Sequence, residues 1–323
     1  MAHSTPLRVL FWGTRSTFSG AIFHALQSAG VDICALFMHA PSAPWQSDLH
    51  PRRVAPFAFP PYGQANADNG NAHLAISLDL ATAPESTLIA GSRQSDAPVY
   101  DIFSLQTPEL PALIRRLQPH VACVACFPQR IPSDLLHLPR HGFLNVHPSL
   151  LPAHRGPAPL FWIFRNGTQA TAGGVTIHHM DARFDTGPMA AQVAVALADG
   201  ISGPEAEQRC TQKGGELLVQ VLQALAAGNL VSQPQPAGGS YQSWPQTTDF
   251  RLDTNWSARR AFNFMCGVAE WGTPFAVEAA GETIHLRRAI AYDAGQKLST
   301  PVRYIDTSLV ELQFSPGVLV AQQ

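Results

Sequence analysis

Lysine is almost missing from this chain of 323 residues, in which only Lys213 and Lys297 occur. The formal net charge at neutral pH is −2, so the molecule as a whole has no positive field that would attract nucleic acid. Nearly all of the positive charge is carried by arginine, which favours local bidentate contacts over diffuse attraction. Composition therefore gives no support to a nucleic-acid partner, although it does not exclude one.

Long apolar runs are absent as well, since no stretch approaches the roughly 18 consecutive apolar residues that a membrane helix needs. The stretch MAHSTPLRVLFWGT is typical of a first β-strand and not of a secretion signal. The cysteines are few and odd in number, five in all, which favours a reducing compartment. We expect a globular cytoplasmic protein with no membrane partner.

The G-x-G-x-x-G fingerprint of dinucleotide-binding proteins is also absent from the turn after the first apolar run, LRVLFWGT. A helical pattern over 17–30 follows this run, and a second apolar run covers 31–39. A strand, a helix and a strand within about 35 residues make a βαβ unit. The predicted fold class is therefore α/β with a parallel sheet.

Residues 41–99 interrupt this pattern with eight prolines and the stretch QANADNGNA, which indicates a long loop or insertion. Residues 204–230 are typical of a helix pair or one interrupted helix, and the following SQPQPAGGS is typical of a linker. We predict a large domain over 1–231, a linker over 232–245 and a smaller, mainly β domain over 246–323. The alternating segment at 275–292 predicts a hairpin that turns at Gly281.

Two polar side chains end a predicted strand in FLNVHPSLLPAHRGPAP, residues 143–159. Asn145 and His147 are two residues apart, so their side chains share one face of the strand. They lie at its carboxyl end, where open α/β sheets hold their active sites. Pro148 and Pro152 prevent a helix from following. The alternative is an ordinary strand that ends in polar loop residues.

A second polar segment, GVTIHHMDARFDTGPM, favours an active site because Asp181 and Asp185 follow a predicted strand that ends at Met180. An Asn, a His and an Asp at one sheet edge suit acyl transfer. The amide can donate to an oxyanion, the imidazole can carry a proton or act as a cation, and the carboxylate can orient the imidazole and keep it charged. No Ser or Cys is placed as a nucleophile, so an amine could attack directly.

Two further patterns carry little weight. Cys123 and Cys126 spell C-x-x-C, but inside an apolar strand and without a second pair, so a metal or redox role is not expected. His178 and His179 are adjacent in a predicted strand and must face opposite sides, which disfavours a metal site built from both. We expect no metal.

NVHPSLLPAHRGPAP followed by GGVTIHHMDARFDTG resembles the signature of the folate-dependent formyltransferases, in which Asn-x-His, Ser-Leu-Leu-Pro and Asp-Thr-Gly or Asp-Ala-Gly recur in this order. LRVLFWGT and VACVACFPQRIP are similar to the family's first strand and to the strand and loop that hold the pterin. The tail from Trp244 is similar to the barrel-like C-terminal domain of methionyl-tRNA formyltransferases and of sugar-nucleotide formyltransferases. The resemblance implies a Rossmann-like catalytic domain followed by an OB-like barrel.

The resemblance also implies roles for single residues. Asn145, His147 and Asp185 would be the catalytic trio, with 10-formyltetrahydrofolate as co-substrate and no metal. The folate would be bordered by Ser149, Leu150, Leu151, Pro152, Phe127, Pro128, Gln129, Arg130, Ile131 and Asp181. Arg15, near a predicted helix N-terminus, and Arg155, after the Ser-Leu-Leu-Pro loop, are candidates for binding an anionic group of the acceptor. A solvated loop arginine is the alternative for Arg155.

The acceptor is where the sequence departs from the tRNA enzymes. Their basic, Gly-rich loop after the second strand is replaced by the Pro-rich insertion, and residues 246–323 have six Arg and one Lys against eight acidic residues. A tRNA-binding surface should be basic. We therefore expect an N-formyltransferase that acts on a primary amine of a small molecule, such as an amino sugar or a modified amino acid. The alternatives are a methionyl-tRNA formyltransferase, a 10-formyltetrahydrofolate hydrolase and a binding module without turnover.

Overall fold

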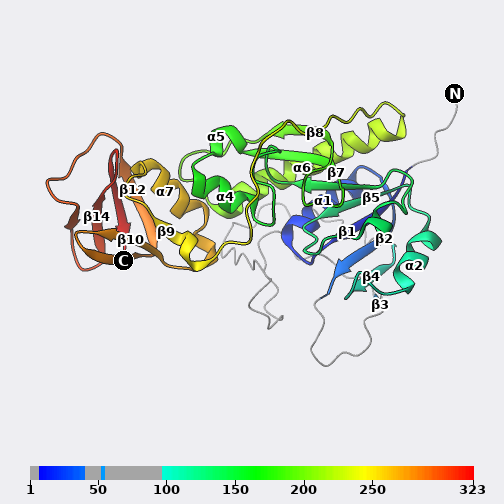
Figure 1. Ribbon diagram of the computed structural model, residues 1–323, viewed down its shortest axis with the longest axis horizontal. Helices are drawn as coiled ribbons and strands as arrows, with labels where there is room; N and C mark the ends of the chain where they lie inside the picture. The colour runs from blue at the N-terminus through cyan, green and yellow to red at the C-terminus, as the bar shows by residue number, and fades with distance from the viewer. Residues whose placement is uncertain (1–6, 41–51, 55–96) are drawn as a thin grey trace.

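The computed structural model describes residues 7–40, 52–54 and 97–323. Most of the predicted insertion at 41–99 lies outside these residues. The described chain forms two parts that follow one another along the long axis of the molecule (Figure 1). One part is an α/β structure built by the first two thirds of the sequence, and the other is a smaller β structure at the C-terminus.

An eight-stranded sheet organises the α/β part, in the order β3-β4-β2-β1-β5-β6-β7-β8. The five central strands are parallel; they are β4 (Val99–Ile102), β2 (Asp32–His39), β1 (Arg8–Gly13), β5 (Val121–Ala125) and β6 (Phe143–His147). The edges are antiparallel and are formed by β3 (Arg52–Val54) on one side and by β7 (Gly174–His179) and β8 (Met189–Ala194) on the other. The predicted parallel-sheet α/β fold is confirmed, with antiparallel strands added at both edges.

Helices cover both faces of this sheet. The first face packs against α1 (Thr17–Ser28) and α6 (Gly203–Ala226), and the second against α2 (Glu109–Leu117) and α3 (Ser133–Leu136). Side chains of β6 alternate between the two cores: Leu144 and Val146 lie on the first face, and Phe143 lies on the second. Asn145 and His147 therefore share the face of Phe143.

Helix α6 runs without a break over Gly203–Ala226, so neither the expected helix pair nor the expected interruption occurs. Gly214 and Gly215 lie in its middle, where it crosses the sheet and α1. A Cβ atom on Gly214 would lie 2.9 Å from Val146 Cγ1, and one on Gly215 would lie 2.6 Å from Ala25 Cβ. The two glycines therefore let the helix approach the sheet and α1 closely.

The C-terminal part contains two small sheets, packed with α7 (Ala258–Gly267). The first holds β9 (Arg251–Leu252), β10 (Phe275–Ala279) and β11 (Glu282–Leu286), and the second holds β12 (Arg288–Asp293), β13 (Val302–Tyr304), β14 (Leu309–Gln313) and β15 (Val318–Gln322). Strands β10 and β11 form the predicted hairpin around Gly281. The prediction of a mainly β C-terminal region is confirmed.

Helix α4 (Pro159–Asn166) joins the two parts, and the short α5 (Gln169–Ala172) follows it. Phe161 and Phe164 of α4 are buried in the core of the C-terminal part. The Phe161 ring lies 5.2 Å from that of Phe250 and 5.5 Å from that of Phe264. Residues of the first part thus contribute to the apolar core of the C-terminal part. Within the described ranges, no helix is both long and apolar enough to span a bilayer.

The contact between α1 and α6 can be tested with Gly215→Ala. At an exposed helix position the change would favour the helix by about 0.8–1 kcal/mol, but overpacking a buried contact typically costs about 1–3 kcal/mol. We expect a lower free energy of unfolding in a urea titration, partly recovered by adding Ala25→Gly. The exposed Gln212→Ala is the control and should change stability by no more than about 0.5 kcal/mol. A Gly215→Ala variant as stable as the parent would contradict the close packing.

Candidate active site

Asn145, His147 and Asp185 converge at the carboxyl end of β6. Asn145 Nδ2 lies 3.4 Å from Asp185 Oδ1, and His147 Nδ1 lies 3.7 Å from the same oxygen. His147 is only 4 % exposed, so the group is sheltered from solvent. The structure thus brings together the three residues that the sequence predicts to be catalytic, and a single carboxylate oxygen lies between the amide and the imidazole.

Asp185 adopts a backbone conformation that is rare for a residue with a side chain, with φ 54°. The N–H of Gly156 donates to its Oδ2 over 2.8 Å. Its carbonyl oxygen accepts from Arg155 Nε over 3.2 Å and from Gln235 Nε2 over 2.7 Å. A strained conformation of this kind persists only where the surroundings determine it. These hydrogen bonds fix both the backbone and the carboxylate of Asp185.

The proton-exchanging nitrogen of His147 follows from its hydrogen bonds. Nε2 lies 2.9 Å from the carbonyl oxygen of His154. A carbonyl oxygen can only accept, so Nε2 carries a hydrogen and donates it. Nδ1 is then the nitrogen that gains or loses a proton, and it faces the carboxylate of Asp185.

His178 is a fourth member of the group, although the sequence pattern indicates no place for it there. Its Nδ1 donates to the carbonyl oxygen of His179 over 2.8 Å, so Nε2 accepts from Asn145 Nδ2 over 3.2 Å. Nε2 also lies 3.5 Å from Asp185 Oδ1. His179 faces the other way, as expected, and bonds Ser232 Oγ over 2.9 Å. His178 therefore orients the Asn145 amide.

Burial and charge act in opposite directions on the pKa values of the group. Burial lowers the pKa of His147, and Asp185 opposes this without overcoming it. The ring is therefore mostly uncharged at neutral pH. Asp185 favours the charged form of His147, as expected, but not strongly enough to keep the ring charged. Burial raises the pKa of Asp185, but the positive charge that His147 or His178 carries when protonated, together with the Gly156 N–H, lowers that pKa below its usual range. Asp185 is therefore ionised.

The predicted pterin loop, 127–131, lies at the carboxyl end of β5. Phe127 packs edge-on against Trp12, with ring centroids 5.2 Å apart, and also against His39. Gln129 Nε2 lies 3.4 Å from His39 Nδ1. Pro128 and Arg130 are exposed, whereas Ile131 is buried. The inner side of the loop therefore packs on aromatic rings, and its outer side is exposed to solvent.

The predicted folate-bordering turn, Ser149 to Pro152, is held by Thr176 of β7. Thr176 Oγ1 donates to the Ser149 carbonyl over 2.7 Å and accepts from the Leu151 N–H over 3.0 Å. The side chains of Ser149 and Leu151 are buried, and those of Leu150 and Pro152 are half-buried. Ser149 and Leu151 therefore shape the turn from inside, and their contact with folate stays a prediction.

Asp181 closes the turn that places Asp185. Its Oδ1 accepts from Thr186 Oγ1 over 2.7 Å and from the Arg183 N–H over 2.9 Å. These two bonds tie both ends of the segment 181–186 together. A folate contact of Asp181 stays a prediction.

The two arginines predicted to bind the acceptor both have partners within the chain. Arg15, beyond β1, pairs with Asp101 of β4 at 2.6 Å. Arg155 Nη2 donates to Gln235 Oε1 over 2.7 Å, and Arg155 Nε donates to Asp185, as described. Arg155 therefore lies beside the trio and holds the backbone of Asp185. Binding of an acceptor by either arginine stays a prediction.

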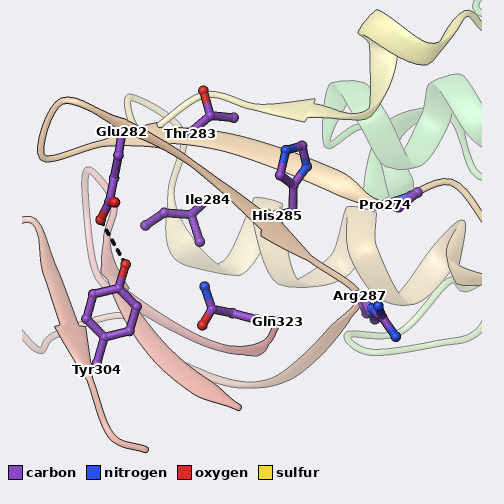
Figure 2. Close-up of a pocket in the computed structure, with 8 residues that line it drawn as sticks. All are labelled: Pro274, Glu282, Thr283, Ile284, His285, Arg287, Tyr304 and Gln323. Carbon is purple, nitrogen blue, oxygen red and sulfur yellow. Dashed lines mark hydrogen bonds between the residues drawn. The ribbon is translucent and has the colours of Figure 1, made fainter. Parts of the chain in front are cut away.

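The C-terminal part contains a separate hollow of about 640 Å³ (Figure 2). It is lined by Pro274, Glu282, Thr283, Ile284, His285, Arg287, Tyr304 and Gln323. Apart from Ile284 these residues are exposed, and the Glu282 carboxylate accepts from the Tyr304 hydroxyl over 2.8 Å. The hollow offers mixed charges in contact with solvent and no sheltered acid–base pair. The trio at β6 is therefore the candidate active site.

Residues 77–222 match the model of the Formyl transferase family. A protein of Trichlorobacter lovleyi named methionyl-tRNA formyltransferase is 34 % identical over 230 residues, which cover 70 % of this chain and 71 % of that protein. The chain belongs to the formyltransferase family. A methionyl-tRNA formyltransferase of Pelotomaculum thermopropionicum is 34 % identical over 174 residues, 54 % of this chain and 55 % of that protein. This formyltransferase-family chain thus spans about half to two thirds of the length of the first curated relatives that it matches.

Among solved structures, an N-formyltransferase from Helicobacter canadensis, in complex with folinic acid and dTDP-3-aminofucose, superposes with a TM-score of 0.61. Its sequence is 11 % identical, and the match covers 98 % of this chain and 99 % of that one. Because the sequence identity is so low, the similarity shows a shared fold and nothing more. The formyltransferase family predicted from the sequence is confirmed by the sequence relatives, and the fold of the Helicobacter canadensis protein matches both parts of the molecule.

Asp185→Asn tests the electrostatic link between Asp185 and His147. The carboxylate raises the pKa of His147, so its loss should move the titration midpoint of the His147 ring to lower pH. An NMR titration of the ring protons measures this directly. Asp199→Asn, which changes a carboxylate paired with Arg259, is the control and should leave the midpoint in place. An unmoved midpoint in Asp185→Asn would rule out the pairing.

Proposed function

We propose that the protein is an N-formyltransferase that moves the formyl group of 10-formyltetrahydrofolate to a primary amine. The observation that carries the proposal is the meeting of Asn145, His147 and Asp185 at the carboxyl edge of the sheet, in a chain of the formyltransferase family. An amide donor, an uncharged imidazole and an ionised carboxylate are the groups that acyl transfer to an amine requires.

The loop beside the trio fits a folate. A pterin is a flat ring with hydrogen-bonding groups along its edge. Trp12 lies among Phe127 and Phe143, with ring centroids 5.2 and 5.6 Å away. Its Nε1–H is buried and has no acceptor among the residues that the structure describes. Phe127, which is half-buried at the outer side of this cluster, would pack against such a ring, and the folate would supply the formyl carbon.

Asn145 donates to the formyl oxygen as that oxygen becomes negative. Its amide nitrogen is oriented by His178, and its contact with Asp185 Oδ1 is long, at 3.4 Å. A hydrogen bond of that length is weak, so the N–H can turn to an oxyanion with little loss. Fixed donors aimed at developing charge are a large source of rate enhancement in acyl transfer.

His147 takes the proton that the amine loses as its nitrogen bonds to the formyl carbon. The ring is uncharged beforehand, and Nδ1 is the nitrogen that can accept. The imidazolium that forms is stabilised by Asp185 and lies close to the oxyanion as a positive charge. When the bond between the formyl carbon and N10 breaks, the proton passes to N10, which leaves the formylated amine and tetrahydrofolate.

The C-terminal part favours a small acceptor over tRNA, because most of its arginines are already engaged. Three of them form ion pairs: Arg251 with Glu278, Arg259 with Asp199 and Arg303 with Glu311. Arg260 lies 3.9 Å above the Trp256 ring and donates to the carbonyl oxygen of Arg165. Six Arg and one Lys against eight acidic residues leave residues 246–323 without net positive charge, whereas tRNA-binding surfaces are basic. We therefore propose a small primary amine, such as an amino sugar.

Methionyl-tRNA is the second candidate acceptor. The names of the Trichlorobacter lovleyi and Pelotomaculum thermopropionicum relatives favour it. The two acceptors differ in a measurable way, because a tRNA ligand releases counterions at each phosphate contact and a small amine does not.

The acceptor is decided by formylation assays with 10-formyltetrahydrofolate, sugar-nucleotide amines and initiator methionyl-tRNA at several salt concentrations. We expect formylation of a small amine with a shallow salt dependence, and weak tRNA binding at physiological salt. Tight tRNA binding that falls by about 0.7–0.9 log units per phosphate contact per log unit of salt would establish the tRNA acceptor instead. Formate release without any amine would indicate a hydrolase.

Asn145→Ala tests the proposed chemistry. Loss of one oxyanion donor typically lowers kcat by about 10²–10³-fold. Folate binding, measured by calorimetry, should persist. Asn255→Ala, at an exposed turn of the C-terminal part, is the matched control and should keep full activity. Near-parental turnover in Asn145→Ala would show that another group binds the oxyanion.

A further inference from the structure

The linker between the two parts lies directly on the loop 152–156, which borders the trio. The Ser240 N–H donates to the Pro152 carbonyl over 3.1 Å, and the Ser240 carbonyl accepts from the Arg155 N–H over 2.9 Å. Gly239 has φ +85°, and a Cβ atom there would lie 2.2 Å from the Pro152 oxygen. This is a backbone-to-backbone contact like that of an added strand. The segment is thus fixed against the active-site loop.

One linker side chain, Gln235, reaches the backbone of Asp185. Its Nε2 donates to the Asp185 carbonyl over 2.7 Å and to the Gly187 carbonyl over 3.0 Å. Its Oε1 accepts from Arg155 Nη2 over 2.7 Å and from Arg155 Nε over 3.1 Å. Arg155 Nε donates to the Asp185 carbonyl as well. Gln235 and Arg155 therefore clamp the carbonyl oxygen of Asp185, the residue whose backbone is strained.

The linker also supports His147, through His154. The His154 carbonyl accepts from His147 Nε2, and the His154 N–H donates to Ser240 Oγ over 2.9 Å. His154 itself has a positive φ of 55°. The positions of His147 and Asp185 thus depend on the same segment of chain, although both residues are far from it in sequence.

We propose that Gln235 is a positioning residue of the active site, and that the linker segment 235–242 is part of the catalytic structure and not a passive tether. Gln235 acts through Asp185: the clamp with Arg155 keeps the carboxylate at His147 Nδ1. The expected effect of Gln235 on kcat rests on the proposed formyl transfer. Its expected effect on the titration of His147 is electrostatic and can be measured without turnover.

Gln235→Leu removes the clamp with little change in volume. The titratable and charged groups around His147 are Asp185, His178, His154 and Arg155. Asp185 raises the pKa of His147, so a displaced carboxylate should move the His147 titration midpoint to lower pH. We expect the NMR midpoint to fall and kcat to drop about 10–100-fold, because small misplacements of catalytic groups are costly. The KM for folate should change little.

Gln233→Leu is the matched control, since Gln233 contacts Met189 of β8 through its backbone N–H and carbonyl. It should leave both the His147 midpoint and kcat unchanged. In the Asp185→Asn background, Gln235→Leu should have little further effect on either quantity, because two residues that act through one group are not additive. Equal, additive effects in both backgrounds would mean that Gln235 acts independently of Asp185 and would overturn the proposal.

A Gln235→Leu variant that matches Gln233→Leu in midpoint and kcat would also overturn the proposal. If Gln235→Leu does not fold, Gln235→Asn provides the same test, because its amide is one methylene too short to reach both carbonyls. If the parent protein formylates no amine, the proposed function fails. The His147 midpoint in the Gln235 variants still decides whether Gln235 positions Asp185.

Discussion

The buried carboxylate of Asp185 is the constraint on which the active site depends. Leaving an ionised group out of water is costly unless hydrogen bonds and charges compensate for the lost hydration. The Gly156 N–H and the Asn145 amide supply that compensation at rest, and His147 adds to it when it becomes protonated. The loop after β7, the end of β6 and the segment that follows Pro152 must therefore all be in place before the carboxylate is stable.

The same carboxylate would explain how the buried His147 can act as the proposed base. Burial alone would make an imidazolium so unfavourable that His147 could hardly accept a proton. With Asp185 opposite Nδ1, the ring is uncharged at rest and still has a partner for the charge it gains. The opposed effects leave the ring able to take a proton and to give it up again within one reaction cycle.

The features that depend on local residue pattern could be predicted from the sequence. The period of two residues in a strand placed Asn145 and His147 on one face, and the βαβ pattern predicted the parallel sheet. The segment after the predicted strand indicated an Asp in the site, and the family resemblance selected Asp185, because no local pattern brings a particular loop residue 40 positions away to Asn145. His178 and Gln235 were missed, since the first depends on the register of β6 with β7 and the second on where the linker returns. The unbroken α6 was missed because the fit of its glycines against Ala25 and Val146 is a tertiary property.

Helix α4 has a consequence for how the molecule can be divided. Phe161 and Phe164 belong by sequence to the α/β part, yet they are buried among residues of the C-terminal part. A chain cut at the linker would expose these rings to water on one side and leave a gap in the core on the other. We therefore expect the two parts to melt in a single cooperative transition.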